Sequence, residues 1–428
     1  MQPFFGNMDD GRYVPLAGSY DPLAFASALF DPQNGFIRWF SWIVIWPASW
    51  LGDRFGAETY FVTNILVSTG CIAVFGYAYS RFSKWQQIWL FPLFMGLALA
   101  WPYTAELFFF PSLQEKAVIL GAAILLLWIV ALDRLRVPWL HVALLIPTTA
   151  LAFTTKTQIL VFIPGLLAAL WISRSSANKP ADFWIRVTAT VLWIAASLGL
   201  VIVAISGSYS SSTQGDIDAS FLQDRRFQLL SAVLIVYLPA LIVRAVMKSV
   251  VAGDFVPAVL LLSMCGAFVV WDIRNYYLAV ASVMVAGALT SLVSWLKITW
   301  LSFVAAVLAA LLAIAWLVLR LPQVYASLAS VGQFLQSESA KDLSSENSTI
   351  LVSCLEAPNH YNEYAVRFDL SGIDFLFAEA GQKTLLDVST YVLADSRLCP
   401  WPPSIPRDGW EPVWTSRYGS QAYALYKR

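Results

Sequence analysis

The sequence predicts a polytopic α-helical membrane protein, with a bundle of about ten transmembrane helices and a small external α/β domain at the C-terminus. The 428 residues are 58% hydrophobic and 13% charged, which is about half the charged content of a typical soluble domain. The mean hydropathy is +0.65, and the apolar residues gather in long runs that continue to Leu321. The 19 Trp and 17 Tyr suit this class, because such rings collect at the two bilayer interfaces.

Composition and motifs also exclude several functions. The net charge is zero and no basic run occurs, so nucleic acid is not an expected partner. The start of the chain lacks the basic region and apolar core of a cleavable signal peptide. The sequence has no GxSxG, HExxH, CxxC or P-loop lysine motif. Its 2 His leave little material for a histidine-based metal site or triad.

Ten apolar runs meet the hydropathy criterion for a span. They are residues 58–80, 87–101, 117–133, 138–153, 157–173, 186–206, 227–247, 254–271, 276–296 and 299–320. The fourth and fifth are short and only residues 154–156 separate them, which is typical of helices that line a cavity. The preceding stretch, 36–51, is apolar but contains Arg38 and Pro47, and so predicts a helix that lies in the interface.

Three regions follow from this pattern. Residues 1–57 form an external acidic loop with the interfacial helix, residues 58–320 form the transmembrane bundle, and residues 321–428 form a linker with an external C-terminal domain. In that domain, Thr349–Leu355 and Tyr391–Ala394 predict strands. Cys354 and Cys399 also lie there, and outside the cytoplasm they either form a disulfide or remain two thiols, since a bridge depends on their distance.

The charges in the connecting loops predict the orientation. The loops on one side carry ten basic residues: Arg81, Lys84, Arg134, Arg136, Arg174, Lys179, Arg186, Arg244, Lys248 and Lys297. The same loops carry three acidic residues: Asp133, Asp182 and Asp254. The positive-inside rule assigns this side to the cytoplasm. The other side, which includes both terminal regions, is then extracytoplasmic.

The loops on that outer side bring together a set of polar residues, most of which border an apolar span. They are Asp9, Asp10, Glu106, Gln114, Glu115, Lys116, Lys156, Asp272 and Arg274. A charge stranded in an apolar span costs about 2.5–3.5 kcal/mol, so charges held at one face predict a shared polar cavity. The carboxylates are candidates for a general base or for ligands of a divalent metal, and Lys156 and Arg274 for binding an anionic phosphate.

Each candidate also has a purely structural interpretation. The sequence Asp-Asp-Gly at residues 9–11 is also typical of a solvated turn. Glu115 and Lys116 also suit the start of the next helix. Lys156 also suits a structural role in which its ammonium group extends to the membrane interface. Arg274 also suits a structural ion pair with Asp272.

Several short motifs together resemble the GT-C superfamily of membrane glycosyltransferases, in particular protein O-mannosyltransferases and the aminoarabinose transferases of lipid A. The first is DDGRYVPL, which starts at Asp9, followed by FIRWFSWIVIWPASWLG from residue 36. The second is TTKTQILVFIPGLLAALW, which contains Lys156. The third is RNYYLAVASVMVAGAL, which starts at Arg274, and the chain ends in EPVWTSRYGSQAYALYKR.

The resemblance implies a fold and a reaction. The expected substrate is a polyprenyl-phosphate sugar in the membrane, and the acceptor is a glycan, lipid or protein. Asp9 or Asp10 is then the general base, and Lys156 and Arg274 bind the donor phosphate. Glu106, Glu115 and Lys116 form the acceptor or metal environment, with a divalent metal as the one cofactor considered. The implied location is the bacterial inner membrane, with the site on the extracytoplasmic face.

The sequence departs from the family at its start. Members place a transmembrane helix before the acidic loop, whereas residues 1–8 alone precede Asp9 here. We therefore expect either a further span upstream of residue 1 or an exported N-terminus.

Two other functions fit parts of the pattern. An O-antigen polymerase or ligase also acts on lipid-linked sugars, but it relies on paired arginines and a histidine in one large external loop. The internal loop GSYSSSTQGDIDASFLQDRR has no histidine. A lipid-linked sugar transporter or flippase predicts internal repeats and helices broken at mid-membrane depth, and the sequence shows neither.

Overall fold

A computed structural model gives the structure of the protein. It describes residues 10–28, 30–31, 36–109, 113–132, 138–172, 180–206, 222–247, 249, 252–270, 275–352, 370–377, 390–394, 408–415 and 424–427.

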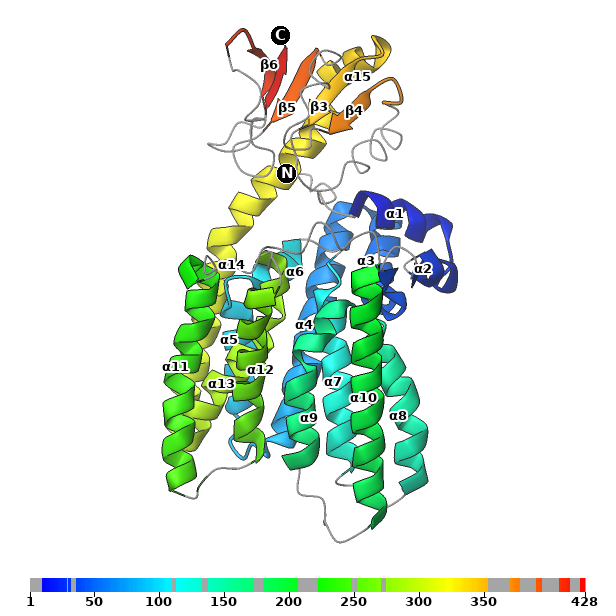
Figure 1. Ribbon diagram of the computed structural model, residues 1–428. Helices are drawn as coiled ribbons and strands as arrows, with labels where there is room; N and C mark the ends of the chain where they lie inside the picture. The colour runs from blue at the N-terminus through cyan, green and yellow to red at the C-terminus, as the bar shows by residue number, and fades with distance from the viewer. Residues whose placement is uncertain are drawn as a thin grey trace.

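The body of the protein is a bundle of helices (Figure 1). Six of its helices are long and apolar enough to cross a membrane, as judged from the described residues. They are α4 (Ala57–Phe82), α7 (Glu115–Leu132), α10 (Pro180–Ser206), α11 (Arg225–Val246), α13 (Ala281–Trp295) together with the 3-10 turn η6 (Asn275–Ala279), and α14 (Thr299–Leu335).

Four helices with shorter apolar stretches complete the bundle. They are α5 (Leu90–Ala100), α8 (Pro138–Phe153), α9 (Ile163–Ile172) after the 3-10 turn η3 (Thr157–Val161), and α12 (Ala252–Val270). The structure thus has a helix in each of the ten predicted ranges, and six of these helices have the length and composition of a full crossing. By the length and composition of these six helices, the chain is a helical membrane protein.

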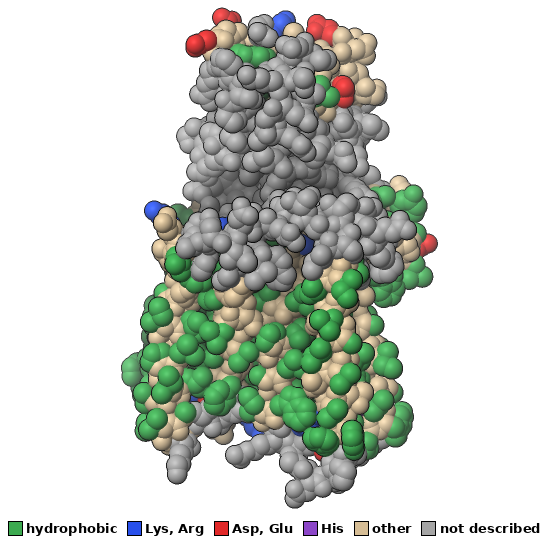
Figure 2. Space-filling model, in the orientation of Figure 1, with side chains coloured by type: hydrophobic (Ala, Val, Ile, Leu, Met, Phe, Trp, Pro, Cys, Tyr) green, Lys and Arg blue, Asp and Glu red, His purple; other side chains and the backbone are tan. Residues whose placement is uncertain are grey.

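Burial separates central helices from peripheral ones. In α7, 78% of the apolar 18-residue stretch is buried inside the protein, whereas the corresponding share in α11 is 17%. Figure 2 shows that hydrophobic side chains cover the visible face of the bundle. An apolar helix whose side chains face outward is stable in lipid, because all its backbone hydrogen bonds are internal.

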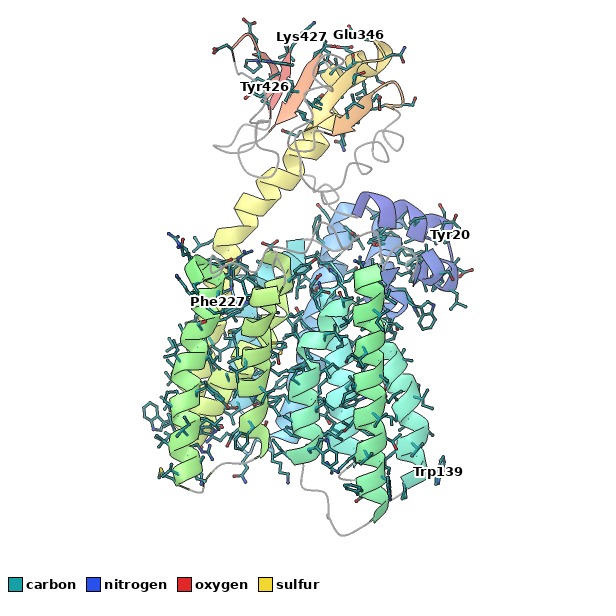
Figure 3. The ribbon with its side chains drawn as sticks, viewed as in Figure 1. Tyr20, Trp139, Phe227, Glu346, Tyr426 and Lys427 are labelled. Atoms are coloured by element: carbon teal, nitrogen blue, oxygen red, sulfur yellow. The ribbon has the colours of Figure 1, made fainter. Side chains whose placement is uncertain are left out.

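The helices alternate in direction between two ends of the bundle. Figure 3 labels Phe227, at the start of α11, and Trp139, at the start of α8, at opposite ends. We call the end that carries the N-terminal helices and the C-terminal sheet the cap end (Figure 1). Close contacts depend on small residues, as between α5 and α14, where a Cβ added to Gly96 would lie 2.9 Å from the Cβ of Ala309.

The N-terminal segment lies at the cap end. It consists of α1 (Asp10–Ser19), α2 (Pro22–Ala28), the antiparallel pair β1 (Phe30–Asp31) and β2 (Phe36–Ile37), the 3-10 turn η2 (Trp39–Ser41), and α3 (Trp42–Phe55). The interfacial helix predicted at 36–51 therefore begins and ends later. It ends because Gly56 has a φ of 92°, a left-handed conformation that glycine adopts without steric cost.

A five-stranded sheet and one helix form the C-terminal domain. Its strands are β3 (Thr349–Val352), β4 (Asp374–Phe377), β5 (Tyr391–Ala394), β6 (Glu411–Thr415) and β7 (Ala424–Lys427). The order is β4-β3-β5-β7-β6, in which β3 is parallel to β4 and β5, and β7 is antiparallel to β5 and β6. The two predicted strand ranges contain β3 and β5.

The region after residue 320 begins as helix rather than as a linker. The apolar part of α14 ends at Leu319, but the helix continues to Leu335 and reaches the sheet (Figure 1). Its last residues, Phe334 and Leu335, are buried with Ile350 and with Leu343 of α15 (Glu338–Ser345). The helix persists because its final turn packs into the core of the C-terminal domain.

Candidate functional site

Three consecutive polar residues at the start of α7 organise the cap end of the bundle. Gln114, Glu115 and Lys116 are at most 2% exposed. The Gln114 carbonyl accepts hydrogen bonds from the amides of Ala117 and Val118, at 2.9 and 3.2 Å, and so begins the helix. Because successive helical residues point about 100° apart, the three side chains reach three different elements.

Each of these side chains contacts a different part of the chain. The Gln114 amide nitrogen lies 3.3 Å from the Tyr13 hydroxyl in α1. A Glu115 carboxylate oxygen lies 2.5 Å from the Lys156 ammonium before η3. The Lys116 ammonium donates to the side-chain oxygen of Asn64 in α4. We call Asn64, Gln114, Glu115, Lys116 and Lys156 the α7 polar cluster.

The ion pair between Lys156 and Glu115 is buried. Lys156 is 8% exposed and Glu115 is fully buried, so the ammonium group does not extend to the interface as one sequence interpretation suggested. The ammonium also lies 4.9 Å from the ring centre of Tyr277 in η6, within the range of a cation–π interaction. The second carboxylate oxygen of Glu115, Oε2, has no hydrogen-bond partner among the described residues.

The N-terminal segment holds the turn that carries Lys156. The Ser41 hydroxyl donates to the Thr155 carbonyl at 2.6 Å, and the Phe40 amide donates to the Thr154 carbonyl at 2.9 Å. Lys156 itself is extended, with φ −169° and ψ 158°. Residues of the N-terminal segment therefore hold the short loop between α8 and α9 through hydrogen bonds. These bonds fix the backbone from which Lys156 reaches Glu115.

Asn64 connects α4 to α6 (Thr104–Phe109) as well as to α7. Its amide nitrogen donates to the carbonyls of Leu107 and Phe108, at 2.7 and 2.9 Å. These carbonyls belong to the last turn of α6 and lack partners within that helix. Asn64 is not among the site residues predicted from the sequence. A polar amide within the predicted span 58–80 is nevertheless a signal that the sequence contains, because polar groups in a span are costly.

The other predicted site residues have different outcomes. Glu106 is half-buried in the first turn of α6. Asp10 is the first residue of α1, and its position shares a helical face with Tyr13, Val14 and Ala17, which are buried. Three predicted parts of the site or the cap lie outside the described residues: Asp9, Arg274 with Asp272, and the cysteines Cys354 and Cys399.

The 3-10 turn η6, which precedes α13 in the late part of the bundle, also contacts the α7 polar cluster. Tyr277 of η6 lies beside Lys156, and the Trp101 indole donates to the Leu278 carbonyl at 3.0 Å. Segments near residues 64, 115, 156 and 277 therefore meet at one buried place. Within the described part of the chain, no group of three or more His, Cys, Asp or Glu side chains is close enough to hold a metal ion. The divalent metal stays a prediction.

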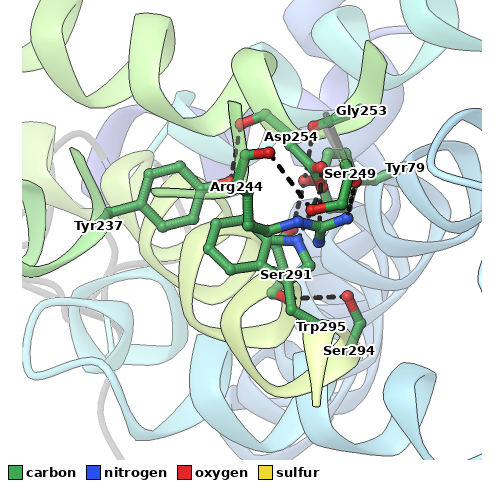
Figure 4. A network of polar contacts seen from close by, with 9 residues as sticks. All are labelled: Tyr79, Tyr237, Arg244, Ser249, Gly253, Asp254, Ser291, Ser294 and Trp295. Carbon is green, nitrogen blue, oxygen red and sulfur yellow. Dashed lines mark hydrogen bonds and ion pairs between the residues drawn. The ribbon is translucent and has the colours of Figure 1, made fainter. Parts of the chain in front are cut away.

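A second polar network, drawn in Figure 4, includes Arg244 in the last turn of α11, and therefore lies at the end of the bundle opposite the cap end (Figure 1). Arg244 of α11 lies 3.5 Å from the Asp254 carboxylate and 4.7 Å from the ring centre of Trp295. The Trp295 indole donates to Asp254 at 2.9 Å. The Tyr237 hydroxyl donates to the Asp254 carbonyl at 2.7 Å. This network ties α11, α12 and α13 together.

A proline explains one further contact in this network. Pro257 lies inside α12, and it has no amide hydrogen to donate to the Gly253 carbonyl four residues earlier. The Tyr79 hydroxyl of α4 donates to that carbonyl at 3.2 Å and also bonds the Ser291 hydroxyl at 2.9 Å. The opposite-end network therefore satisfies backbone and ionic groups within the bundle, which is a structural role.

The fold and the α7 polar cluster define a helical membrane protein with a buried ionic site at one end of its bundle. Comparison of the chain with known protein families, with curated protein sequences and with solved structures finds no match.

Proposed function

We propose that this protein is a membrane glycosyltransferase of the GT-C type, which moves a sugar from a polyprenyl-phosphate donor to an acceptor. The observation that carries the proposal is the buried pair of Lys156 and Glu115, with Lys116 beside it, beneath α1. A chain that is 13% charged keeps these ionic groups buried at considerable cost. A requirement for charge chemistry at the membrane surface explains why it does so.

The cluster has the chemistry of an anion site. Two ammonium groups, those of Lys116 and Lys156, belong to it. The proposal therefore assigns Lys116 to the donor phosphate, whereas the family resemblance grouped it with the acceptor or metal environment. The cluster also includes the start of the 18-residue helix α7, where the helix dipole favours a negative charge. A phosphate that bears a lipid chain would reach these groups while its chain remained in the bilayer.

The proposed reaction is an inverting displacement. The Asp10 carboxylate, or that of Asp9, accepts the proton of the acceptor hydroxyl as the hydroxyl oxygen attacks the anomeric carbon. The bond between that carbon and the phosphate oxygen breaks, and the polyprenyl phosphate leaves with its negative charge. Lys156 and Arg274 stabilise this charge as it develops. Asp10 is the preferred base, because its position lies on the face of α1 that contains Tyr13, and Tyr13 contacts Gln114.

Glu115 has a separate role in this proposal. Its carboxylate pairs with Lys156 through one oxygen, and Oε2 is left as an acceptor. That oxygen suits a hydroxyl of the substrate or a divalent metal ligated together with other groups. Glu106, in the first turn of α6, belongs to the same acceptor or metal environment in the proposal.

The proposed arrangement in the membrane has ten crossings, with the cap end outside the cytoplasm in a bacterial inner membrane. The basic loop residues at the opposite end support it, since Arg81, Lys84 and Lys297 lie there and cytoplasmic loops are rich in such residues. A lipid-linked donor on the outer side also keeps its leaving group in the membrane.

The test is transfer of radiolabelled sugar from polyprenyl-phosphate donors by the purified protein, with extracted cell-envelope glycans, lipids or peptides as acceptors. We expect Asp10→Asn to lower turnover at least a hundredfold, the usual contribution of a general base. Asp21→Asn is the matched control, because Asp21 is an exposed carboxylate of the same segment that caps α2. Full turnover in Asp9→Asn/Asp10→Asn would disprove the base assignment, and no transfer by the wild type would disprove the function.

A further inference from the structure

The amide of Asn64 has every hydrogen-bonding group occupied. The two protons on its nitrogen go to the carbonyls of Leu107 and Phe108. Its oxygen accepts from the Lys116 ammonium, and the Ser68 hydroxyl lies 3.4 Å from it. An asparagine amide has two donor protons and two acceptor sites, so this one is saturated.

This pattern fixes the orientation of the amide. If the amide were rotated by 180°, its nitrogen protons would face the Lys116 ammonium and its oxygen would face two carbonyl oxygens. Both contacts would be repulsive, and all these groups are buried away from water, so no solvent would compensate them. The carbonyl end of α6 therefore orients Asn64, and Asn64 in turn presents its oxygen to Lys116.

The position of the Lys116 ammonium depends on this oxygen. Lys116 is fully buried, and a long flexible side chain needs fixed acceptors to hold its charged group in one place. Asn64 comes from α4 and Lys116 from α7, two helices in direct contact. The geometry points to Asn64 as a positioning residue, which holds the Lys116 ammonium at the place where the phosphate of a polyprenyl-phosphate donor binds.

This inference rests on the proposed function, and it adds a residue that does not itself touch the substrate. Asn64 acts through Lys116, so its replacement should weaken donor binding more than it slows the chemical step. The oxygen of Asn64 also carries no charge. A carboxylate at the same position would keep the contact with Lys116 but would neutralise the cation and compete with the phosphate.

The experiment compares Asn64→Asp, Asn64→Leu and a control, Ser68→Ala. Asn64→Asp keeps the shape of the side chain but turns a carboxylate oxygen toward the Leu107 and Phe108 carbonyls. Asn64→Leu removes the polar groups without adding a charge. Ser68 touches the same amide oxygen and the same Leu107 carbonyl, at 3.4 and 3.3 Å, so its replacement alters the surroundings of the amide but keeps the acceptor of Lys116. We expect both Asn64 variants to raise the donor KM on the order of tenfold to a hundredfold, the worth of a hydrogen bond to a charged group. The acceptor KM should be unchanged, and Ser68→Ala should match the wild type.

A double-mutant cycle with Lys116→Gln separates positioning from general damage to the fold. If Asn64 acts through Lys116, then Asn64→Leu should raise the donor KM no further once Lys116 has been replaced. A structural role would give additive effects and would raise the donor and acceptor KM together. Additive effects, or a wild-type donor KM in a folded Asn64→Leu protein, would overturn the inference. If Asn64→Leu does not fold, Asn64→Ser is judged by the same criteria.

Binding of polyprenyl phosphate without a sugar keeps this test apart from that of the proposed function. The probe is decaprenyl phosphate in detergent, and the readout is the shift it causes in the melting temperature. A wild type that neither binds the probe nor transfers sugar would refute the proposed function. A wild type that binds it, together with folded Asn64 variants that bind it equally well, would refute only the role of Asn64.

Discussion

At the scale of single residues, buried charges govern the cap end of the bundle. Glu115 is fully buried and Lys156 is 8% exposed, and their charged groups lie 2.5 Å apart. A pair of this kind adds little net stability, because desolvation offsets the attraction between the charges. Its loss is costly, however, since one partner then remains as an uncompensated buried charge. The two residues should therefore behave very differently when replaced singly and together.

Lys156→Met should destabilise the protein by about 3–5 kcal/mol, the usual cost of removing one partner of a buried ion pair. Lys341→Met is the control, because Lys341 is exposed on α15. Glu115→Leu/Lys156→Met should recover much of the loss. Thermal unfolding of the purified protein in detergent measures all three, and a single variant as stable as the double one would contradict the buried pair.

A hydroxyl at the opposite end of the bundle should matter for a different reason. Tyr79→Phe leaves the Gly253 carbonyl without its donor, since Pro257 cannot replace it. The expected loss is about 1–3 kcal/mol, the cost of an unsatisfied buried acceptor. Tyr77→Phe is the control, because Tyr77 lies in the same helix and is 51% exposed. Equal melting temperatures for the two variants would contradict this role of the Tyr79 hydroxyl.

At the scale of elements, the ends of the helices determine how the segments are placed. The start of α11 is an example. Asp224 is its N-cap and accepts a hydrogen bond from the Arg226 amide at 2.7 Å. The Arg226 guanidinium also contacts this carboxylate, at 2.8 Å from Oδ2. These contacts hold the pKa of Asp224 below its ordinary value, so the cap is ionised at neutral pH.

The lowered pKa of Asp224 predicts how the stability of this helix start depends on pH. A carboxyl whose folded-state pKa is depressed stabilises the fold fully above its unfolded pKa of about 3.9. The stabilisation is lost as the pH falls through the folded-state pKa. Asp224→Asn keeps a capping side chain without the charge, so the difference in melting temperature between wild type and variant should be constant from pH 8 to 5 and should shrink in more acidic solution. A constant difference down to pH 2 would contradict the shift.

Helix α14 shows that an element can belong to two parts of the molecule. Its apolar portion, Thr299–Leu319, has the composition of a span. The remainder continues to Leu335 and enters the core of the C-terminal domain. One helix therefore links the bundle to the sheet, and the hydropathy pattern ends well before the secondary structure does.

At the scale of the whole molecule, the two ends of the protein carry different elements and different charged residues. The N-terminal helices, the sheet and the α7 polar cluster lie toward the cap end, whereas Arg81 and Arg244 lie toward the opposite end (Figures 1 and 4). The bilayer would meet the apolar surface between them (Figure 2). This asymmetry makes the orientation testable without any assumption about the reaction.

Labelling of single cysteines should distinguish the two ends. In a background where all 4 Cys are replaced by Ser, Asp408→Cys places a thiol at an exposed position beside β6, and Arg81→Cys places one at the exposed end of α4. A membrane-impermeant maleimide should label Asp408→Cys in cells whose membrane that holds the protein is exposed but sealed. It should label Arg81→Cys only after the cells are opened. The reverse pattern would show that the cap end faces the cytoplasm.

The sequence by itself determined the class of the protein and the approximate positions of the ten apolar helices of its bundle. Hydropathy is sufficient for this, because a chain in lipid must satisfy its backbone hydrogen bonds locally. It also placed strands in Thr349–Leu355 and Tyr391–Ala394, where short apolar runs and nearby turns mark them. The polar residues at the outer ends of the spans, among them Glu115 and Lys156, were selected on the same ground, since charge is costly beside lipid.

Tertiary structure alone decided which of these polar groups meet. Hydropathy reports how each segment interacts with solvent, but the contact of Lys156 with Glu115 depends on how α7 packs against η3. The hydrogen bonds of Asn64 depend on how α4, α6 and α7 pack together. The extension of α14 to Leu335 likewise follows from its contact with the C-terminal domain. Contacts between residues distant in sequence are set by packing, which no local pattern records.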